Sequence, residues 1–281
     1  MRSYTPESDV SFVEANGLRF GYLAAGEGPL VLLMHGFPDT PHTWDDARKA
    51  LAGAGFRAVS PFMRGYAPSQ IPERDAYYTR DLGEDVLALI EALGYKSAIL
   101  VGHDWGAMAV YAAAHLGPDR VDKLVTVAIP HPRTIKPSLR TLWQVRHFFA
   151  FKLPGATRRF CRDDFRQVDV LYKRWSPTWD APAAELEPVK NAFAAPGSTH
   201  AALGYYRCLR FKPDAFMKER IGVPTMIFAG LDDLLMPEVY DSGKWMFTGE
   251  YKVERLPGGH FLHRESSEKF VAALVAFVKS T

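Results

Sequence analysis

Short runs of apolar residues recur along the chain, each bounded by glycine, proline or polar residues, and they predict buried strands. Residues 29–34 and 98–101 are continuously apolar, as expected for strands that are covered on both faces of a parallel sheet, and residues 121–129 indicate a further strand. Residues 223–230 repeat this pattern, and residues 251–256 alternate between apolar and polar positions. The pattern therefore predicts a mostly parallel central sheet.

Helical periodicity alternates with these strands. It is found at residues 82–93, 107–114 and 267–278, while residues 11–25 resemble a pair of strands at the start of the chain. Strands that alternate with helices are typical of the α/β class, with helices flanking the sheet. We therefore expect an α/β fold.

The strand pattern stops between about residues 131 and 216. Aromatic and basic residues crowd three helical stretches there, at 141–153, 158–175 and 182–209. A helical cap inserted between two strands explains this interruption most simply. We predict a core formed by residues 1–130 and 216–281 and a cap, or lid, formed by residues 131–215.

The composition of the chain excludes several classes of function. With 281 residues, 47% of them hydrophobic and 23% charged, the chain can bury one large core. A net charge of +2 does not create the strong positive electrostatic potential that would attract nucleic acid. The two cysteines, Cys161 and Cys208, form neither a disulfide framework nor a zinc site, and His260 and His263 lack an evident third metal ligand. We expect no metal and no cofactor.

No apolar run is long enough to span a membrane, and the first residues do not resemble a signal peptide. These observations favour a cytoplasmic protein without a membrane span. A homodimer is compatible with the sequence.

The most informative segment is residues 101–106, in which Asp104 lies between Gly102 and Gly106. An apolar strand precedes it and a helix follows directly, which is the arrangement of a nucleophile elbow. Glycines on both sides allow the tight turn and the close helix–strand packing that such an elbow needs. The alternative is an ordinary strand-to-helix turn capped by an aspartate.

Two further polar residues follow strands downstream. Asp233 comes after residues 223–230, and His260 comes after residues 251–256. The order nucleophile, acid, histidine is the one expected of an α/β-hydrolase.

These segments together resemble the epoxide hydrolase family of the α/β-hydrolase superfamily, in which aspartate replaces serine as the nucleophile. Residues 35–38 resemble the oxyanion-hole motif of the family, residues 62–69 resemble its Arg-Gly-Tyr-Gly-x-Ser loop, and residues 102–106 match its elbow. Residues 230–233 resemble its acid segment, and residues 259–261 match its histidine segment. The resemblance covers nearly the whole chain and implies an α/β-hydrolase fold with a helical cap.

The chemistry of an epoxide explains why the nucleophile would be Asp104. Opening an epoxide is a displacement at saturated carbon, and a carboxylate is ionised at neutral pH without a neighbouring base. The resulting alkyl ester must then be hydrolysed, for which His260, oriented by Asp233, is the expected general base. The resemblance implies that the backbone N–H groups of Phe37 and Trp105 form the oxyanion hole.

Ring opening also needs a proton donor opposite Asp104. Residues 202–207 resemble the cap segment of the family that carries one donor tyrosine, which places that donor at Tyr206. The position of the second family tyrosine, seven residues before a Pro-Gly pair, is occupied by His147. We expect a His147/Tyr206 donor pair; the alternative is that His147 only packs among cap aromatics.

The expected substrate is a small apolar epoxide, with water as the second reactant. Trp105, Phe37, Phe148 and Phe149 are candidates for contacting it, although aromatic residues at helical spacing often belong to a core.

Two alternatives to epoxide hydrolysis remain at this stage. A haloalkane dehalogenase would use the same aspartate and two halide donors, for which a second cap tryptophan is a candidate at Trp143, Trp175 or Trp179. A non-catalytic receptor on the same fold would not need a water-activating base.

Overall fold

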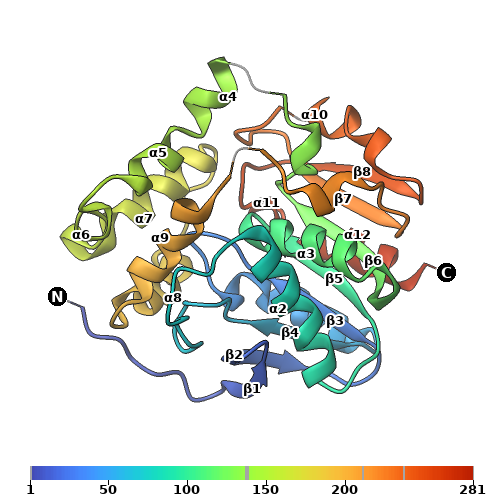
Figure 1. Ribbon diagram of the computed structural model, residues 1–281, viewed down its shortest axis with the longest axis horizontal. Helices are drawn as coiled ribbons and strands as arrows, with labels where there is room; N and C mark the ends of the chain where they lie inside the picture. Colours follow the sequence, from blue (N-terminus) through green and yellow to red (C-terminus); the bar gives the residue numbers. More distant parts are fainter. Residues whose placement is uncertain (1, 137–138, 211, 237, 281) are drawn as a thin grey trace.

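The computed structural model describes residues 2–136, 139–210, 212–236 and 238–280. Among these residues, eight strands form one sheet in the order β1-β2-β4-β3-β5-β6-β7-β8 (Figure 1). The strand β2 pairs antiparallel with β1 on one side and with β4 on the other, and all other neighbours are parallel. The strands are β1 (Ser11–Ala15), β2 (Leu18–Ala25), β3 (Leu30–Met34), β4 (Arg57–Pro61), β5 (Ala98–His103), β6 (Val121–Val127), β7 (Thr225–Gly230) and β8 (Tyr251–Leu256).

Helices cover both faces of the sheet. The alternation of side chains along β3 separates the core into two parts, because Leu32 packs with α2 and α3 on one face while Leu33 packs with α1 and α12 on the other. These core helices are α1 (Asp45–Gly53), α2 (Thr79–Ala92), α3 (Trp105–Leu116), α10 (Glu238–Asp241), α11 (Leu262–Glu265) and α12 (Ser267–Lys279).

Between β6 and β7 the described residues form helices and no strand. In Figure 1 these helices lie together on the left, beside the edge of the sheet where β5 ends. They are α4 (Leu139–Gln144), α5 (Arg146–Lys152), α6 (Ala156–Phe160), α7 (Arg162–Trp175), α8 (Ala183–Ala194) and α9 (Ser198–Cys208). We refer to them as the cap. Residues 137, 138 and 211 of the expected cap lie outside the described residues.

The α/β fold is confirmed, and each predicted strand is present with shifts of a few residues at its ends. The three long cap helices expected from periodicity are each divided in two. Val145 separates α4 from α5, Cys161 separates α6 from α7, and the stretch 195–197 separates α8 from α9. The last break contains Pro196 and Gly197, residues that end helices because proline lacks the N–H and glycine adopts the left-handed conformation.

Candidate active site

The turn between β5 and α3 holds Asp104 in a backbone conformation that few residues adopt, with φ 50° and ψ −117°. The neighbouring glycines make this turn possible. A Cβ atom on Gly106 would lie 2.1 Å from the carbonyl oxygen of Met34, and one on Gly102 would lie 2.3 Å from the carbonyl oxygen of Gly106. A Cβ atom on Gly36 would lie 2.4 Å from the Cβ of Asp104 itself. The sequence thus presents a carboxylate at the end of β5, as predicted for a nucleophile elbow.

Three catalytic candidates meet at the carboxyl ends of three parallel strands. His260 follows β8, and its Nδ1 lies 3.1 Å from Oδ1 of Asp233, which follows β7. Its other ring nitrogen, Nε2, lies 3.4 Å from Oδ2 of Asp104. Asp232, the neighbour of Asp233, is exposed. The structure therefore brings together the same three residues that the order of motifs indicated.

The backbone N–H of Phe37 donates a hydrogen bond of 2.9 Å to Oδ1 of Asp104. Phe37 follows β3, and its peptide bond with Pro38 is cis. This places one donor where the oxyanion hole was predicted. No hydrogen bond from the N–H of Trp105 to Asp104 is formed among the described residues, so the second donor stays a prediction.

Burial and neighbouring charges shift the pKa values of Asp104 and His260 in opposite directions. Burial alone would raise the pKa of the Asp104 carboxyl, but the hydrogen bond and the charge of His260 outweigh it and hold that pKa below its ordinary value. Burial would likewise lower the pKa of His260, but the carboxylates of Asp233 and Asp104 raise it to about 10. The resting site is therefore a carboxylate and an imidazolium at neutral pH.

Contacts between core and cap fix the position of His260. Its backbone N–H donates to the carbonyl oxygen of Trp175 at 2.9 Å, at the end of α7. Ser176 Oγ accepts from the N–H of Phe261 at 3.1 Å and donates to Glu265 at 2.6 Å. The loop that carries the histidine is thus tied to the cap, so cap and catalytic loop are positioned together.

A buried cluster that sequence analysis missed lies behind His260. The side chains of Asp39, His103 and His263 each offer one ligand atom, and these atoms lie within 4.8 Å of one another. His103 Nε2 donates to the carbonyl oxygen of His260 at 3.0 Å, which links the end of β5 to the loop that carries the catalytic histidine. The donor types suit either a zinc ion or one shared buried water. Only tertiary packing brings Asp39 to this cluster, and no local motif signals it.

A cavity of about 270 Å³ extends from the catalytic residues between core and cap. Asp104, Trp105 and His260 lie along its wall, and the cap contributes Phe148 and Trp175. Apolar side chains form most of the remaining wall: Met108, Ile129, Ile135, Leu142, Val145, Leu209, Met217, Leu234 and Leu235. The cavity therefore suits a small apolar molecule.

The two predicted proton donors lie next to each other in the cap. The rings of Tyr206 and His147 are 5.8 Å apart between centroids, and Tyr206 also packs against Trp105 at 5.4 Å and against Phe37 at 5.0 Å. The Tyr206 hydroxyl is buried and has no hydrogen-bond partner among the described residues. Burial and the charge of Arg174 lower the pKa of His147 to about 3, so its ring is neutral at pH 7.

The remaining aromatic candidates are placed differently. Phe149 is 47% exposed and does not line the cavity, because adjacent residues on a helix point about 100° apart and Phe148 faces inward. Phe37 is fully buried beneath Tyr206, so its backbone, rather than its ring, faces Asp104. Trp143 is exposed, whereas Trp175 lines the cavity with a buried indole N–H that has no partner among the described residues. Trp179 packs against Phe261.

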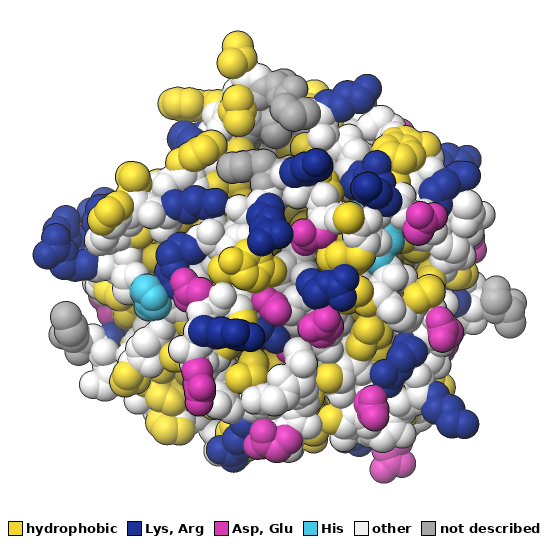
Figure 2. Space-filling model, in the orientation of Figure 1, with side chains coloured by type: hydrophobic (Ala, Val, Ile, Leu, Met, Phe, Trp, Pro, Cys, Tyr) yellow, Lys and Arg dark blue, Asp and Glu magenta, His cyan; other side chains and the backbone are white. Residues whose placement is uncertain are grey.

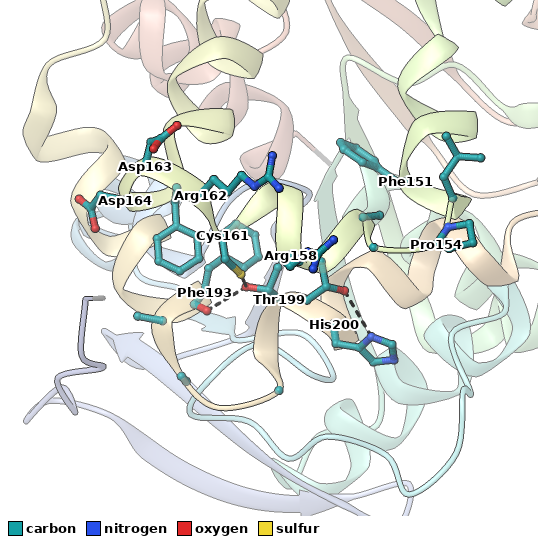
Figure 3. Close-up of a pocket in the computed structure, with 18 of the residues that line it drawn as sticks. Phe151, Pro154, Arg158, Cys161, Arg162, Asp163, Asp164, Phe193, Thr199 and His200 are labelled. Carbon is teal, nitrogen blue, oxygen red and sulfur yellow. Dashed lines mark hydrogen bonds between the residues drawn. The ribbon is translucent and has the colours of Figure 1, made fainter.

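A second, larger cavity of about 1030 Å³ lies within the cap and includes Arg2 from the start of the chain. Figure 3 shows Arg158 and Arg162 reaching into it between Phe151 and Phe193. It contains none of the predicted catalytic residues.

Arg64 holds its own loop in place as part of a buried ion pair. Its guanidinium contacts both carboxylate oxygens of Asp85 on α2, and it also donates to the backbone carbonyl of Ala76. Arg64 does not line the active-site cavity.

Comparison with known proteins identifies the family of the chain. A family model described as the alpha/beta hydrolase fold matches residues 29–267. The AB hydrolase superfamily protein YfhM of Bacillus subtilis is 34% identical over 233 residues, covering 79% of this chain and 80% of that protein. An epoxide hydrolase of Caballeronia sordidicola is 30% identical over 315 residues, covering 95% of this chain and 93% of that protein.

Among solved structures, the epoxide hydrolase of Bacillus megaterium in complex with an inhibitor superposes with a TM-score of 0.86 at 26% identity, covering 96% of this chain and 100% of that chain. The family model, the relatives and this structural neighbour all indicate the same fold and family. The chain therefore belongs to the α/β-hydrolase family and, within it, to the epoxide hydrolases.

Proposed function

We propose that this protein converts a small apolar epoxide into a vicinal diol through a covalent ester on Asp104. One observation carries the proposal. One carboxylate oxygen of Asp104 accepts a hydrogen bond from the N–H of Phe37, and the other lies next to Nε2 of His260. The opposite ring nitrogen of His260, Nδ1, lies next to the carboxylate of Asp233. This arrangement provides a nucleophile, an oxyanion donor and a water-activating base.

In the first step, the Asp104 carboxylate attacks a ring carbon of the epoxide. Oδ1 is held by Phe37, so Oδ2 is the oxygen that forms the new C–O bond. The ring C–O bond breaks, and the departing oxygen takes a proton from Tyr206 or His147. A donor is required because the alkoxide is about as basic as hydroxide, whose conjugate acid has a pKa of roughly 15.7.

The neighbouring positions of the two donors support their assignment. The phenol of Tyr206 is buried and has no hydrogen-bond partner among the described residues; it does not line the cavity, but its ring packs against that of Trp105, which does. His147 lines the cavity and is neutral, so it would donate as an imidazole rather than as an imidazolium.

Alkylation turns His260 from an acid into a base. Once Asp104 is an ester it carries no charge, so the interaction that helps to keep His260 protonated is lost. The proton released by His260 replaces the one that the ring-opening donor gave up. His260 is then a neutral base oriented by Asp233.

In the second step, water gives a proton to Nε2 of His260 and its oxygen bonds to the carboxyl carbon of Asp104. Negative charge develops on Oδ1, which the N–H of Phe37 stabilises. The ester C–O bond breaks, the diol oxygen takes the proton from His260, and Asp104 is released as an acid that reprotonates His260. The two steps together convert one epoxide and one water molecule into one diol.

Haloalkane dehalogenation is the second candidate, because Trp175 lines the cavity, its indole N–H has no partner in the part of the chain that the structure describes, and Trp105 follows the nucleophile. Incubation with styrene oxide and, separately, with 1-bromobutane distinguishes the two reactions. We expect diol without bromide; bromide in preference to diol would favour the dehalogenase. Tight ligand binding without either product would indicate a receptor.

The same assay with Asp104→Asn should show no turnover. The variant His260→Gln should retain the first step and accumulate the ester, which intact mass measurement detects as an adduct of the mass of the epoxide. Absence of an adduct would contradict the roles given to the two residues. A cytoplasmic location and a homodimer stay predictions, which fractionation and light scattering would test.

A further inference from the structure

The cap carries an exposed apolar surface that the proposed reaction does not use. Among the described residues, twelve large hydrophobic side chains are exposed, and five of them fall within fifteen consecutive positions on α4, α5 and the residue that follows. We call this surface the cap ridge; it consists of Leu139, Leu142, Trp143, Phe149 and Leu153.

The cap ridge follows two consecutive helices. On α4, Leu139 is three and four residues from Leu142 and Trp143, and at the end of α5 Phe149 and Leu153 are four residues apart, so each helix exposes apolar side chains at helical spacing. Leu139 is 87% exposed, Trp143 68% and Leu153 58%. Figure 2 shows hydrophobic side chains along this outer edge of the molecule. Soluble proteins rarely expose such a contiguous stripe without a partner for it.

The charge around the cap ridge identifies the partner. Residues 133–162 contain eight Lys and Arg and no Asp or Glu, whereas the rest of the chain has 26 Lys and Arg against 32 Asp and Glu. The basic side chains adjoin the apolar ones: Arg146 lies over the Trp143 ring at 4.3 Å, and Arg159 donates to the carbonyl of Pro154 at 2.9 Å. Figure 2 shows further Lys and Arg side chains at the tip formed by α6.

We propose that the cap ridge docks the protein onto the surface of a lipid bilayer that contains anionic lipids. Leucine and tryptophan on one face, with lysine and arginine beside them, are the composition of helices that lie in a membrane interface. A second copy of the chain fits less well, because it would bring two strongly positive surfaces together. Nucleic acid would explain the charges but not the exposed leucines.

The docking would be peripheral, since no helix among the described residues has the length and apolar character to cross a bilayer. Leu142 belongs to the cap ridge and also lines the active-site cavity. If the proposed function holds, this position allows an apolar epoxide dissolved in the membrane to enter the site directly. The docking itself does not depend on turnover.

The test is co-sedimentation of the full chain with vesicles of phosphatidylcholine alone and of phosphatidylcholine containing about one third phosphatidylserine. We expect binding to the anionic vesicles, weakened by high salt, and little binding to the neutral ones. The variant Arg158→Gln/Arg159→Gln/Arg162→Gln should lower the apparent affinity on the order of 100-fold, since each basic residue contributes about fivefold near such a surface. The variant Leu139→Ser/Trp143→Ser should lower it at least about tenfold.

Matched controls lie outside the cap. Phe12→Ser removes an aromatic ring that is 41% exposed on β1, and Lys49→Gln/Lys269→Gln/Lys279→Gln removes three exposed charges from α1 and α12. Both controls should bind within about twofold of the wild type, because charges and rings remote from the interface contribute little. Asp104→Asn should also bind normally, which separates docking from catalysis.

Three results would overturn the proposal. The first is wild-type protein that does not bind anionic vesicles, and the second is binding that the cap variants and the controls reduce equally. The third is a cap variant that dissociates a dimer in light scattering, or that loses binding to duplex RNA, while its vesicle binding is unchanged.

Discussion

Removing the charge of Asp104 should convert His260 from an acid into a base, and Asp104→Asn imitates the uncharged ester for this purpose. The carboxylate oxygen lies 3.4 Å from Nε2 of His260, and both side chains are largely buried. At this distance and an effective dielectric constant of about 20, the charge–charge interaction is about 5 kcal/mol. Since one pKa unit corresponds to about 1.4 kcal/mol, this is large enough to bring the pKa of His260 down from about 10 to near neutrality.

An NMR titration of the His260 ring measures this effect. We expect a wild-type ring that stays protonated until about pH 10 and an Asp104→Asn ring that loses its proton near neutral pH. The control is Asp45→Asn, which removes a carboxylate beside His42 and should leave His260 unchanged. If the pKa of His260 stayed near 10 in Asp104→Asn, the proposed change from acid to base on alkylation would be refuted.

The same ion pair predicts the pH dependence of stability. Because the pKa of His260 is raised above its ordinary value of 6.5, the protonated ring stabilises the folded state below about pH 6.5. That contribution is lost as the pH rises through about 10. Urea unfolding at a series of pH values should show this loss in the wild type and a smaller one in Asp104→Asn.

Three further variants test other parts of the account. His147→Ala should slow alkylation of Asp104 on the order of 10²-fold and leave ester hydrolysis nearly unchanged; rapid-quench kinetics that show equal effects on both steps would remove His147 as a donor. Gly106→Ala should lower the free energy of unfolding by about 3 kcal/mol or more, because the new Cβ atom would lie 2.1 Å from a backbone oxygen. The control Gly53→Ala places no atom within 4 Å of the new Cβ and should change the free energy of unfolding by less than about 1 kcal/mol. Arg64→Met should cost about 3–5 kcal/mol by leaving a charge unpaired, and the added change Asp85→Leu should recover part of that loss.

The elements closest to the chemistry were the most predictable. Asp104, Asp233 and His260 each follow an apolar run that becomes a buried strand, and parallel strands bring their carboxyl ends to one edge of the sheet. A local pattern therefore located three residues that are far apart in sequence. Gly106 belongs to this predictable part, because the tight turn requires it.

Other parts depend on packing that a single sequence does not reveal. The strand β4 and the helix α1 were not anticipated. The strand β4 lacks an apolar run because it contains Arg57 and Ser60, and α1 combines a modest apolar face with Gly53 at its end. Phe148 and Phe149 were equally good candidates for the cavity until the orientation of α5 separated them. The cluster of Asp39, His103 and His263 combines the loop after β3, the end of β5 and the helix α11, which are far apart in sequence.

The covalent ester on Asp104 is tested most directly by a single turnover in ¹⁸O-labelled water with enzyme in excess over epoxide. If water attacks the carboxyl carbon, the label enters the Asp104 side chain, and mass spectrometry of the peptide that contains residues 101–106 should show one added ¹⁸O while the diol remains unlabelled. Label found in the diol, with none in that peptide, would mean that water opens the epoxide directly and would contradict the account.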